Sequence, residues 1–143
     1  MTGASRVPGS PRHASHDIRV LVVDDHPLVR TTLTELLDDE EDLTVVGECE
    51  DGSQVVEATA RLHPDVVCMD MSMPHMNGLA ATEALRAARS DVRIVMYTGG
   101  PEGRPAIAAA GADALVPKSA RPDALIRCLR AVADGESGCP YCL

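Results

Sequence analysis

VLVVDDHP (residues 20–27) is a run of four apolar residues that leads directly into two adjacent aspartates, Asp24 and Asp25. An unbroken run of Val and Leu is typical of a strand that is buried on both faces, as in a parallel sheet covered by helices. Two neighbouring carboxylates at the end of such a strand repel each other. An explanation for this pair therefore has to come from the other residues that the fold brings to the same place.

Apolar runs rich in Val and Ile recur along the chain, and stretches of helical periodicity separate them. The runs, which predict five strands, cover residues 18–23, 43–49, 65–69, 92–97 and 114–117. Between the first two runs, apolar residues share one helical face at Val29, Leu33, Leu36 and Leu37. Five strands that alternate with five helices predict a doubly wound α/β fold, with a five-stranded parallel sheet and helices on both faces.

Composition limits the kind of protein that this chain can be. The 143 residues suit one domain, and no apolar run approaches the roughly 18 residues of a membrane span. The net charge is −9 and the only aromatic residues are two Tyr, so we expect no direct binding of nucleic acid. Because the first 16 residues lack the apolar core of a secretory signal, we expect a cytoplasmic protein without membrane contact.

We expect three segments: a disordered N-terminal arm (1–17), a folded domain (18–133) and a C-terminal tail (134–143). The tail contains CPYC (139–142), which has the spelling of a glutaredoxin redox centre. That chemistry requires the first cysteine at a helix N-terminus, so a frayed tail is the simpler interpretation. The other cysteines lie in apolar segments, and we expect them to be small buried hydrophobic residues: Cys49, Cys68 and Cys128.

Polar residues stand at or just beyond the ends of four of the five predicted strands. They are Asp24, Asp25, Asp70, Thr98 and Lys118. Because an open α/β sheet binds its ligand beyond the carboxyl ends of its strands, we expect these side chains to converge. A single aspartate after a strand is usually a turn or cap residue, so it is the joint placement that indicates function.

The residue types at this edge favour phosphoryl chemistry. Three carboxylates about 5 Å apart would repel by roughly 3 kcal/mol per pair, so they need a cation or must take up protons. An all-oxygen site with few protein ligands favours Mg²⁺. Lysine and threonine side chains are groups that hold a phosphoryl oxygen, so together the residues predict phosphoryl transfer to a carboxylate nucleophile. His26 and His75 flank the site, but two histidines make a poor transition-metal site, and we interpret them as loop residues.

Four segments carry a resemblance to a known family, and they come in the family's order and at nearly its spacing. They are VVDDHP (22–27), DVVCMDMSMPHMNG (65–78), VMYTG (95–99) and GADALVPK (111–118). Through them, residues 18–133 resemble the receiver domain of bacterial two-component response regulators. The sequences VVGECEDG (45–52) and MNGLAATEALR (76–86) are most similar to those of the NarL/LuxR class. The resemblance implies flavodoxin-like strand order 2-1-3-4-5 and a role in transcription regulation or other phosphorelay signalling.

The resemblance also implies a role for each residue of the site. Asp70 would be the phospho-acceptor, supplied by a sensor histidine kinase or a small phosphodonor. Asp25 would ligate Mg²⁺ directly and Asp24 largely through water, and Asp70 and the backbone carbonyl of Ser72 would complete the protein ligands. Thr98 would form a hydrogen bond to a phosphoryl oxygen after transfer, and Lys118 would pair with another.

Two departures from the family pattern concern the residues through which a receiver would signal that it is phosphorylated. Receivers usually carry an aromatic residue three positions before the lysine, and this chain has Leu115 there. The segment GGPEGRP (99–105) replaces the usual start of the fourth helix. Its glycines and prolines predict a fourth helix that is short, beginning near Pro105, or irregular. The chemistry is therefore expected to be intact and the readout altered.

Other functions stay open at this point. A receiver that is regulated without phosphorylation would act as a binding module, and Leu115 favours that alternative. A phosphatase of the haloacid-dehalogenase type would need a second aspartate where this chain has Ser72. NarL/LuxR-class regulators usually continue into a helix-turn-helix domain, whereas this chain stops ten residues after Ala133. We favour a stand-alone receiver, acting on a downstream protein or by self-association, over the isolated receiver of a DNA-binding transcriptional regulator.

Overall fold

The computed structural model describes residues 17–100, 103–136 and 139–143. The strands are β2 (Ile18–Val23), β3 (Leu43–Cys49), β4 (Val66–Asp70), β5 (Arg93–Thr98) and β6 (Ala114–Pro117). The helices are α2 (Pro27–Asp38), the short 3₁₀ helix η1 (Gly52–Gln54), α3 (Val55–Leu62), α4 (Gly78–Ala87), α5 (Arg104–Ala110) and α6 (Pro122–Ala133). The predicted arm over residues 1–17 lies, apart from Asp17, outside the described residues.

All five strands form one parallel sheet in the order β3-β2-β4-β5-β6. Numbered along the chain, this is the order 2-1-3-4-5, so the predicted topology is confirmed. After β2 the chain crosses to one side to form β3 and then returns to place β4 on the other side of β2. This reversal opens a crevice beyond the ends of β2 and β4, which is where ligands bind in doubly wound sheets.

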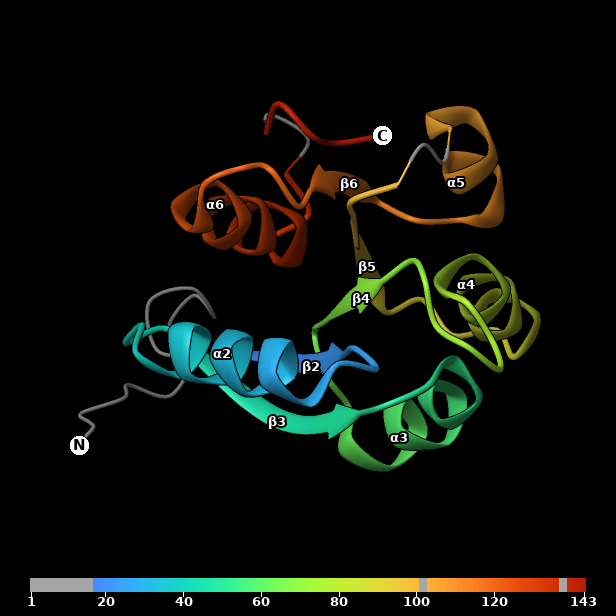
Figure 1. Ribbon diagram of the computed structural model, residues 1–143, viewed down its shortest axis with the longest axis horizontal. Helices are drawn as coiled ribbons and strands as arrows, with labels where there is room; N and C mark the ends of the chain where they lie inside the picture. The colour runs from blue at the N-terminus through green and yellow to red at the C-terminus, as the bar shows by residue number, and fades with distance from the viewer. Residues whose placement is uncertain (1–16, 101–102, 137–138) are drawn as a thin grey trace, which may run out of the picture.

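The helices form a layer on each side of the sheet (Figure 1). Helices α2 and α6 pack against one face, and α3, α4 and α5 pack against the other. Alternate residues of β2 enter the two cores: Val20 and Val22 on the α2 side, Leu21 and Val23 on the α3 side. All four side chains are buried, which explains the unbroken apolar run that precedes Asp24. Within the described ranges, no helix combines the length and the apolar character needed to cross a bilayer.

Helix α5, the fourth α-helix along the described chain, is short, as predicted. It covers seven residues, starts at Arg104 and has Pro105 in its first turn. Gly111 ends it with a φ of 108°, a left-handed conformation that residues with a side chain rarely adopt. The prolines and glycines of residues 99–105 thus explain why α5 has only about two turns.

The C-terminal residues differ from the predicted frayed tail. Cys142 pairs with Ala114 in an antiparallel bridge along the free edge of β6. The backbone N–H of Leu115 donates to the carbonyl of Tyr141 at 2.9 Å, and that of Leu143 donates to Asp113 at 3.0 Å. An edge strand presents unpaired backbone N–H and C=O groups, and residues 139–143 form hydrogen bonds with some of them. The prediction of fraying was therefore wrong for these residues.

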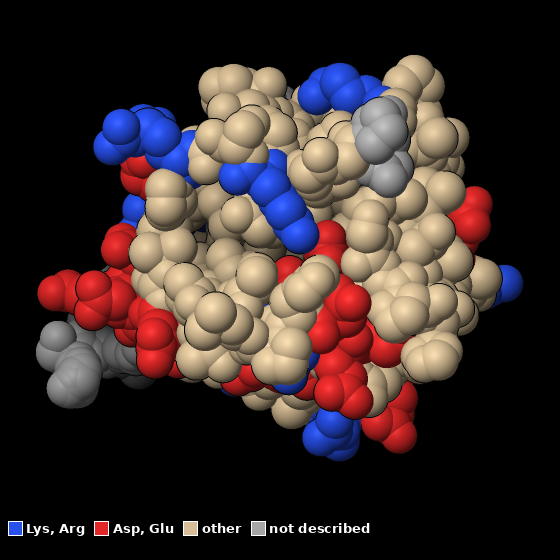
Figure 2. All heavy atoms as spheres, in the orientation of Figure 1, with Lys and Arg blue, Asp and Glu red and all other residues tan. Residues whose placement is uncertain are grey.

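Charge is unevenly distributed over the surface (Figure 2). On the face shown, acidic side chains gather near the centre, over the region where Figure 1 shows β2 and β4 ending. A single basic side chain extends toward this acidic group from above. The carboxyl edge of the sheet is thus one place on this face where opposite charges meet.

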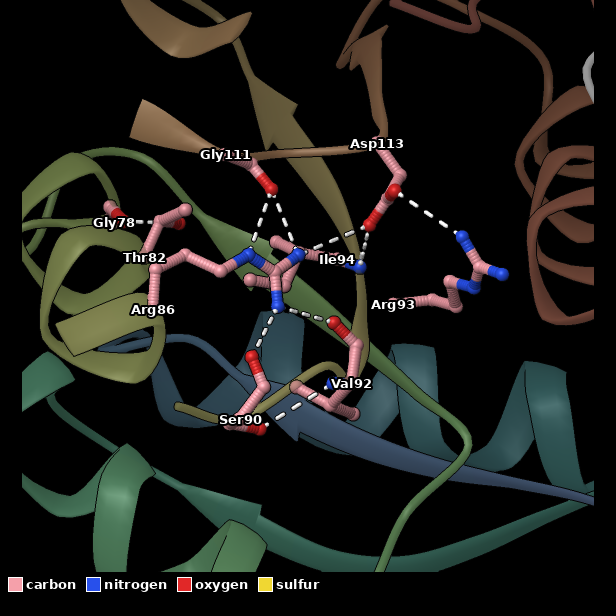
Figure 3. Close-up of polar contacts among 9 residues, drawn as sticks. All are labelled: Gly78, Thr82, Arg86, Ser90, Val92, Arg93, Ile94, Gly111 and Asp113. Carbon is pink, nitrogen blue, oxygen red and sulfur yellow. Dashed lines mark hydrogen bonds and ion pairs between the residues drawn. The ribbon is translucent and has the colours of Figure 1, made fainter. Parts of the chain in front are cut away.

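Arg86, near the end of α4, connects this helix to the loops that precede β5 and β6 (Figure 3). Its Nε and Nη2 atoms donate to the carbonyl of Gly111, at 3.1 and 2.7 Å. Its Nη1 atom donates to the carbonyls of Ser90 and Val92, at 3.0 and 2.7 Å. Nη2 also lies 3.3 Å from Asp113, whose Oδ2 atom accepts the N–H of a β5 residue at 2.8 Å. One guanidinium thus holds together the amino ends of β5 and β6, at the edge opposite the acidic group.

Candidate functional site

Four side chains from two segments of the chain converge beyond the ends of β2 and β4. Asp24, Asp25, His26 and Asp70 each offer one ligand atom, and these atoms all lie within 4.8 Å of one another. Asp24 and Asp70 are buried, whereas the Asp25 side chain is 26% exposed. The three aspartates therefore lie together, as the sequence predicted. His26 is an added member of the cluster, with Nδ1 3.1 Å from Asp25 Oδ1.

The start of α2 fixes the position of Asp24. The backbone N–H of His26 donates to Asp24 Oδ1 at 2.8 Å, and Pro27 begins the helix immediately afterwards. Arg30, one turn later, donates from Nη1 to the carbonyl of Asp24 at 2.6 Å. Its Nε atom pairs with Glu48 of β3 at 3.2 Å. This role of Arg30 was not predicted from the sequence. The only signal was its position four residues after His26, one helical turn from the site.

The loop after β4 brings α4 close to Asp70. Asn77 caps α4, and its Oδ1 atom accepts the N–H of Ala80 at 2.8 Å. The next residue is Gly78, and a Cβ atom there would lie 2.6 Å from the backbone oxygen of Asp70. A side chain at position 78 would therefore displace the strand end that carries Asp70.

Lys118 is the positive group that faces the acidic cluster. Its Nζ atom lies 3.1 Å from Asp70 Oδ1, and its side chain is 31% exposed. Burial raises the pKa of the Asp70 carboxyl, the charge of Asp24 raises it further, and Lys118 opposes both effects. Burial lowers the pKa of Lys118, but its hydrogen bond to Asp70 outweighs this, so the net shift is upward. Lys118 therefore stays charged and partly compensates the carboxylate that it contacts.

Three carboxylate oxygens of the cluster lack a hydrogen-bond donor. Asp24 Oδ2, Asp25 Oδ1 and Asp70 Oδ2 are buried, and no group in the described part of the chain donates a hydrogen bond to them. One lysine cannot neutralise three carboxylates, and a buried unpaired charge is costly. The carboxylate oxygens of the three aspartates suit a hard divalent cation such as Mg²⁺. Ser72, whose carbonyl was predicted as a further ligand, lines a surface cavity of about 500 Å³ together with Asp25.

Thr98 ends β5, and Lys118 directly follows the neighbouring strand β6, on the other side of Asp70. In the sheet register Asp70 pairs with Tyr97, so Thr98 lies one residue further on. The backbone N–H of Lys118 donates to the carbonyl of Thr98 at 2.7 Å. Thr98 is buried, and its hydroxyl oxygen accepts the N–H of Gly100 at 3.1 Å. The predicted phosphate-binding pair thus lies next to the acidic cluster, at the carboxyl ends of β5 and β6.

An aromatic residue reaches the Thr98 side of the site from an unexpected part of the chain. A surface cavity of about 500 Å³ is bordered by Thr98, Leu115, Lys118 and Tyr141, among others. Leu115, at the position where receivers usually have an aromatic ring, is buried. Tyr141 comes from the C-terminal residues that pair with β6. No local pattern in the sequence indicated this residue, because its placement depends on the pairing of distant backbone segments.

Comparison with known proteins agrees with this geometry. Residues 20–130 match the family model for the response regulator receiver domain. The chain belongs to the response regulator receiver family. The fold and the family expected from the sequence are therefore confirmed.

Known relatives are regulators of the NarL/LuxR class. The nitrate/nitrite response regulator protein NarL of Escherichia coli K12 is 36% identical over 119 residues, which cover 82% of this chain and 55% of NarL. The response regulator GacA of Pseudomonas aeruginosa is 39% identical over 121 residues, which cover 83% of this chain and 56% of GacA. This receiver thus spans about half the length of the curated relatives that it matches.

Solved structures extend the similarity to three dimensions. A two-component response regulator of the LuxR family from Aurantimonas is 30% identical with a TM-score of 0.79, and the match covers 84% of this chain and 87% of that one. The receiver domain of the response regulator NarL from Mycobacterium tuberculosis is 28% identical, also with a TM-score of 0.79, over 84% and 98% of the two chains. The similarity covers most of both solved chains.

Proposed function

We propose that this receiver accepts a phosphoryl group on Asp70 from a phosphohistidine of a sensor histidine kinase, and that phosphorylation switches its contact with a downstream protein. One observation carries the proposal. Asp70 is a buried carboxylate at a strand end, with Lys118 at 3.1 Å and two more aspartates within 4.8 Å. A purely structural role gives no reason to bury carboxylates together in this way.

In the proposed reaction, an oxygen of the Asp70 carboxylate attacks phosphorus. The phosphorus–nitrogen bond of the donor breaks, a phosphorus–oxygen bond forms, and the histidine ring of the kinase leaves with the electron pair of the broken bond. Lys118 pairs with negative charge on the transferred group, and Asp24 and Asp25 would hold Mg²⁺ together with Asp70 and the carbonyl of Ser72. When bound, Mg²⁺ supplies the positive charge that lets two anions approach.

The switch would begin at Thr98. Phosphorylation adds negative charge and acceptor oxygens at Asp70, which can draw the hydroxyl of a nearby threonine toward it. In the present structure the Thr98 oxygen accepts the N–H of Gly100, so its movement would alter that loop. The same loop borders the cavity that contains Leu115 and Tyr141. We therefore place the readout at the β5–α5 loop and the β6 edge.

Mg²⁺ should stabilise the wild-type chain and leave Asp25→Asn unaffected. At about ten times its dissociation constant, a ligand that binds only the folded state adds about 1.4 kcal/mol to the free energy of unfolding. For a domain of this size the melting temperature should rise by about 3 to 6 °C. Scanning calorimetry with Mg²⁺ and with a chelator measures the difference. An equal rise in Asp25→Asn would place the ion elsewhere.

Hydrogen exchange with beryllium fluoride tests the proposed function. Beryllium trifluoride occupies the place of a phosphoryl group on an aspartate, so with Mg²⁺ it should change amide exchange around residues 98–100 and 115–118 by about threefold or more. Asp70→Asn, treated in the same way, should show no change. If the wild-type chain also shows no change in these segments, the receiver is not switched at Asp70, and the alternative of a phosphorylation-independent binding module replaces the proposal.

A further inference from the structure

Two cysteines that are distant in the sequence touch where the C-terminal residues cross α6. The Sγ atoms of Cys128 and Cys139 lie 3.2 Å apart, and both thiols are free. Cys128 is buried on the inner face of α6, and Cys139 is half-buried. A disulfide bond is about 2.05 Å long, so the two sulfur atoms would have to approach by only about 1 Å.

Backbone pairing holds Cys139 in this position. Residues 139–143 are fastened to the edge of β6 by the bridge between Cys142 and Ala114 and by the hydrogen bond from Leu115 to Tyr141. The N–H of Tyr141 also donates to the sulfur of Cys139 at 3.3 Å. The sulfur contact is therefore part of a docked segment that has several independent anchors.

The two thiols border the same cavity and are chemically unequal. Both line a surface cavity of about 460 Å³, which Arg127 and Glu136 also border. Burial raises the pKa of Cys139, but its hydrogen bonds with the Cys128 thiol and the Tyr141 N–H outweigh this, so the net shift is downward. Burial raises the pKa of Cys128, and the shared hydrogen bond adds to this. Cys139 is thus the more readily ionised member, and the thiolate is the reactive form of cysteine.

We propose that Cys128 and Cys139 form a reversible disulfide that locks residues 139–143 onto the edge of β6. With a peroxide as oxidant, the Cys139 thiolate attacks one oxygen and the oxygen–oxygen bond breaks, which yields a sulfenic acid and one water after protonation. The Cys128 sulfur then attacks the Cys139 sulfur and displaces the hydroxyl group as a second water. Two thiols lose two electrons and two protons to the peroxide, and a thiol reductant reverses the change.

This modification is independent of Asp70 but acts next to the Thr98 cavity. The locked segment includes Tyr141, which borders that cavity. A disulfide would raise the fraction of time that the segment covers β6, because residues 139–143 could no longer separate from α6. The edge of β6 would then be open to a partner only in the reduced protein.

Intact mass and peptide mapping of the full chain test the proposal. After reduction and treatment with hydrogen peroxide, the mass should fall by about 2 Da and a peptide pair linked through Cys128 and Cys139 should be recovered. Cys139→Ser should prevent the loss, and Cys142→Ser, the matched control, should retain it. The amides of Leu115 and Leu143 should exchange about tenfold more slowly in the oxidised protein.

Three results would overturn the proposal. They are a link between Cys139 and Cys142, loss of the 2 Da change in Cys142→Ser, and oxidation of Cys139 by oxygen addition alone, with about 32 Da gained and no cross-link. Because Cys128 is buried in α6, Cys128→Ala could fail to fold. Cys139 is half-buried and lies outside the helices, so Cys139→Ser should fold and tests the proposal even if Cys128→Ala does not fold.

Discussion

Asp70→Asn should abolish phosphoryl uptake and at the same time stabilise the fold. Asparagine keeps the shape of the side chain but has no anionic oxygen, so uptake from a small phosphodonor should fall below about 1% of the wild-type extent. In Mg²⁺-free buffer the free energy of unfolding should rise by about 1 kcal/mol, because the change removes one charge from a buried cluster that holds Asp24 as well. Intact mass and urea unfolding measure the two effects.

Asp91→Asn is the matched control for this variant. Asp91 is exposed and precedes β5, at the end of the sheet opposite the acidic cluster. The substitution removes the same charge, so phosphoryl uptake and stability should both stay near the wild-type values. Uptake by Asp70→Asn at the wild-type level would assign the acceptor to another residue. A loss of stability in Asp70→Asn would mean that the Lys118 pair outweighs the repulsion within the cluster.

Arg86→Met should lower the free energy of unfolding by about 3 kcal/mol. The methionine side chain retains most of the packing volume but none of the donors. The carbonyls of Ser90, Val92 and Gly111 would lose their partner, and so would one contact to Asp113 (Figure 3). The Arg86 side chain is 27% exposed, so water can replace only part of these hydrogen bonds. Urea unfolding monitored by circular dichroism gives the value.

Two further variants make the Arg86 result specific. Arg86→Lys should recover less than half of the loss, because a point charge cannot reach carbonyls on several sides at once. Arg89→Met should change the free energy of unfolding by less than about 0.5 kcal/mol, because Arg89 follows Arg86 closely in the sequence but is exposed. A loss in Arg86→Met no larger than that in Arg89→Met would show that the network contributes little.

The fold and the acidic cluster could be predicted because they follow from short-range patterns. The unbroken apolar runs identified the strands, and every observed strand boundary lies within one residue of its predicted position. Strand ends of a parallel sheet share one edge, so residues as far apart as Asp24 and Asp70 could be placed together without knowledge of their contacts. The short α5 was predictable for a similar reason, because proline and glycine act locally on the backbone.

The missed features depend on backbone partners that leave no signal in the sequence. Arg86 donates mainly to carbonyl groups, which every residue carries, so nothing marks Gly111 or Val92 as its partners. The same holds for the segment that ends in Leu143, because its pairing with β6 uses main-chain atoms. Tyr141 and the contact between Cys128 and Cys139 follow from that pairing. They could not be inferred from the spelling CPYC alone.

Phosphoryl transfer to the wild-type chain is the measurement that tests the central claim most directly. The reduced protein is incubated with a small phosphodonor, with Mg²⁺ or with a chelator, and its intact mass and the modified peptide are determined. The proposal predicts the gain of one phosphoryl group, about 80 Da, on the peptide that contains Asp70 and only when Mg²⁺ is present. No gain under conditions that modify another receiver, or a gain on a peptide without Asp70, would contradict it.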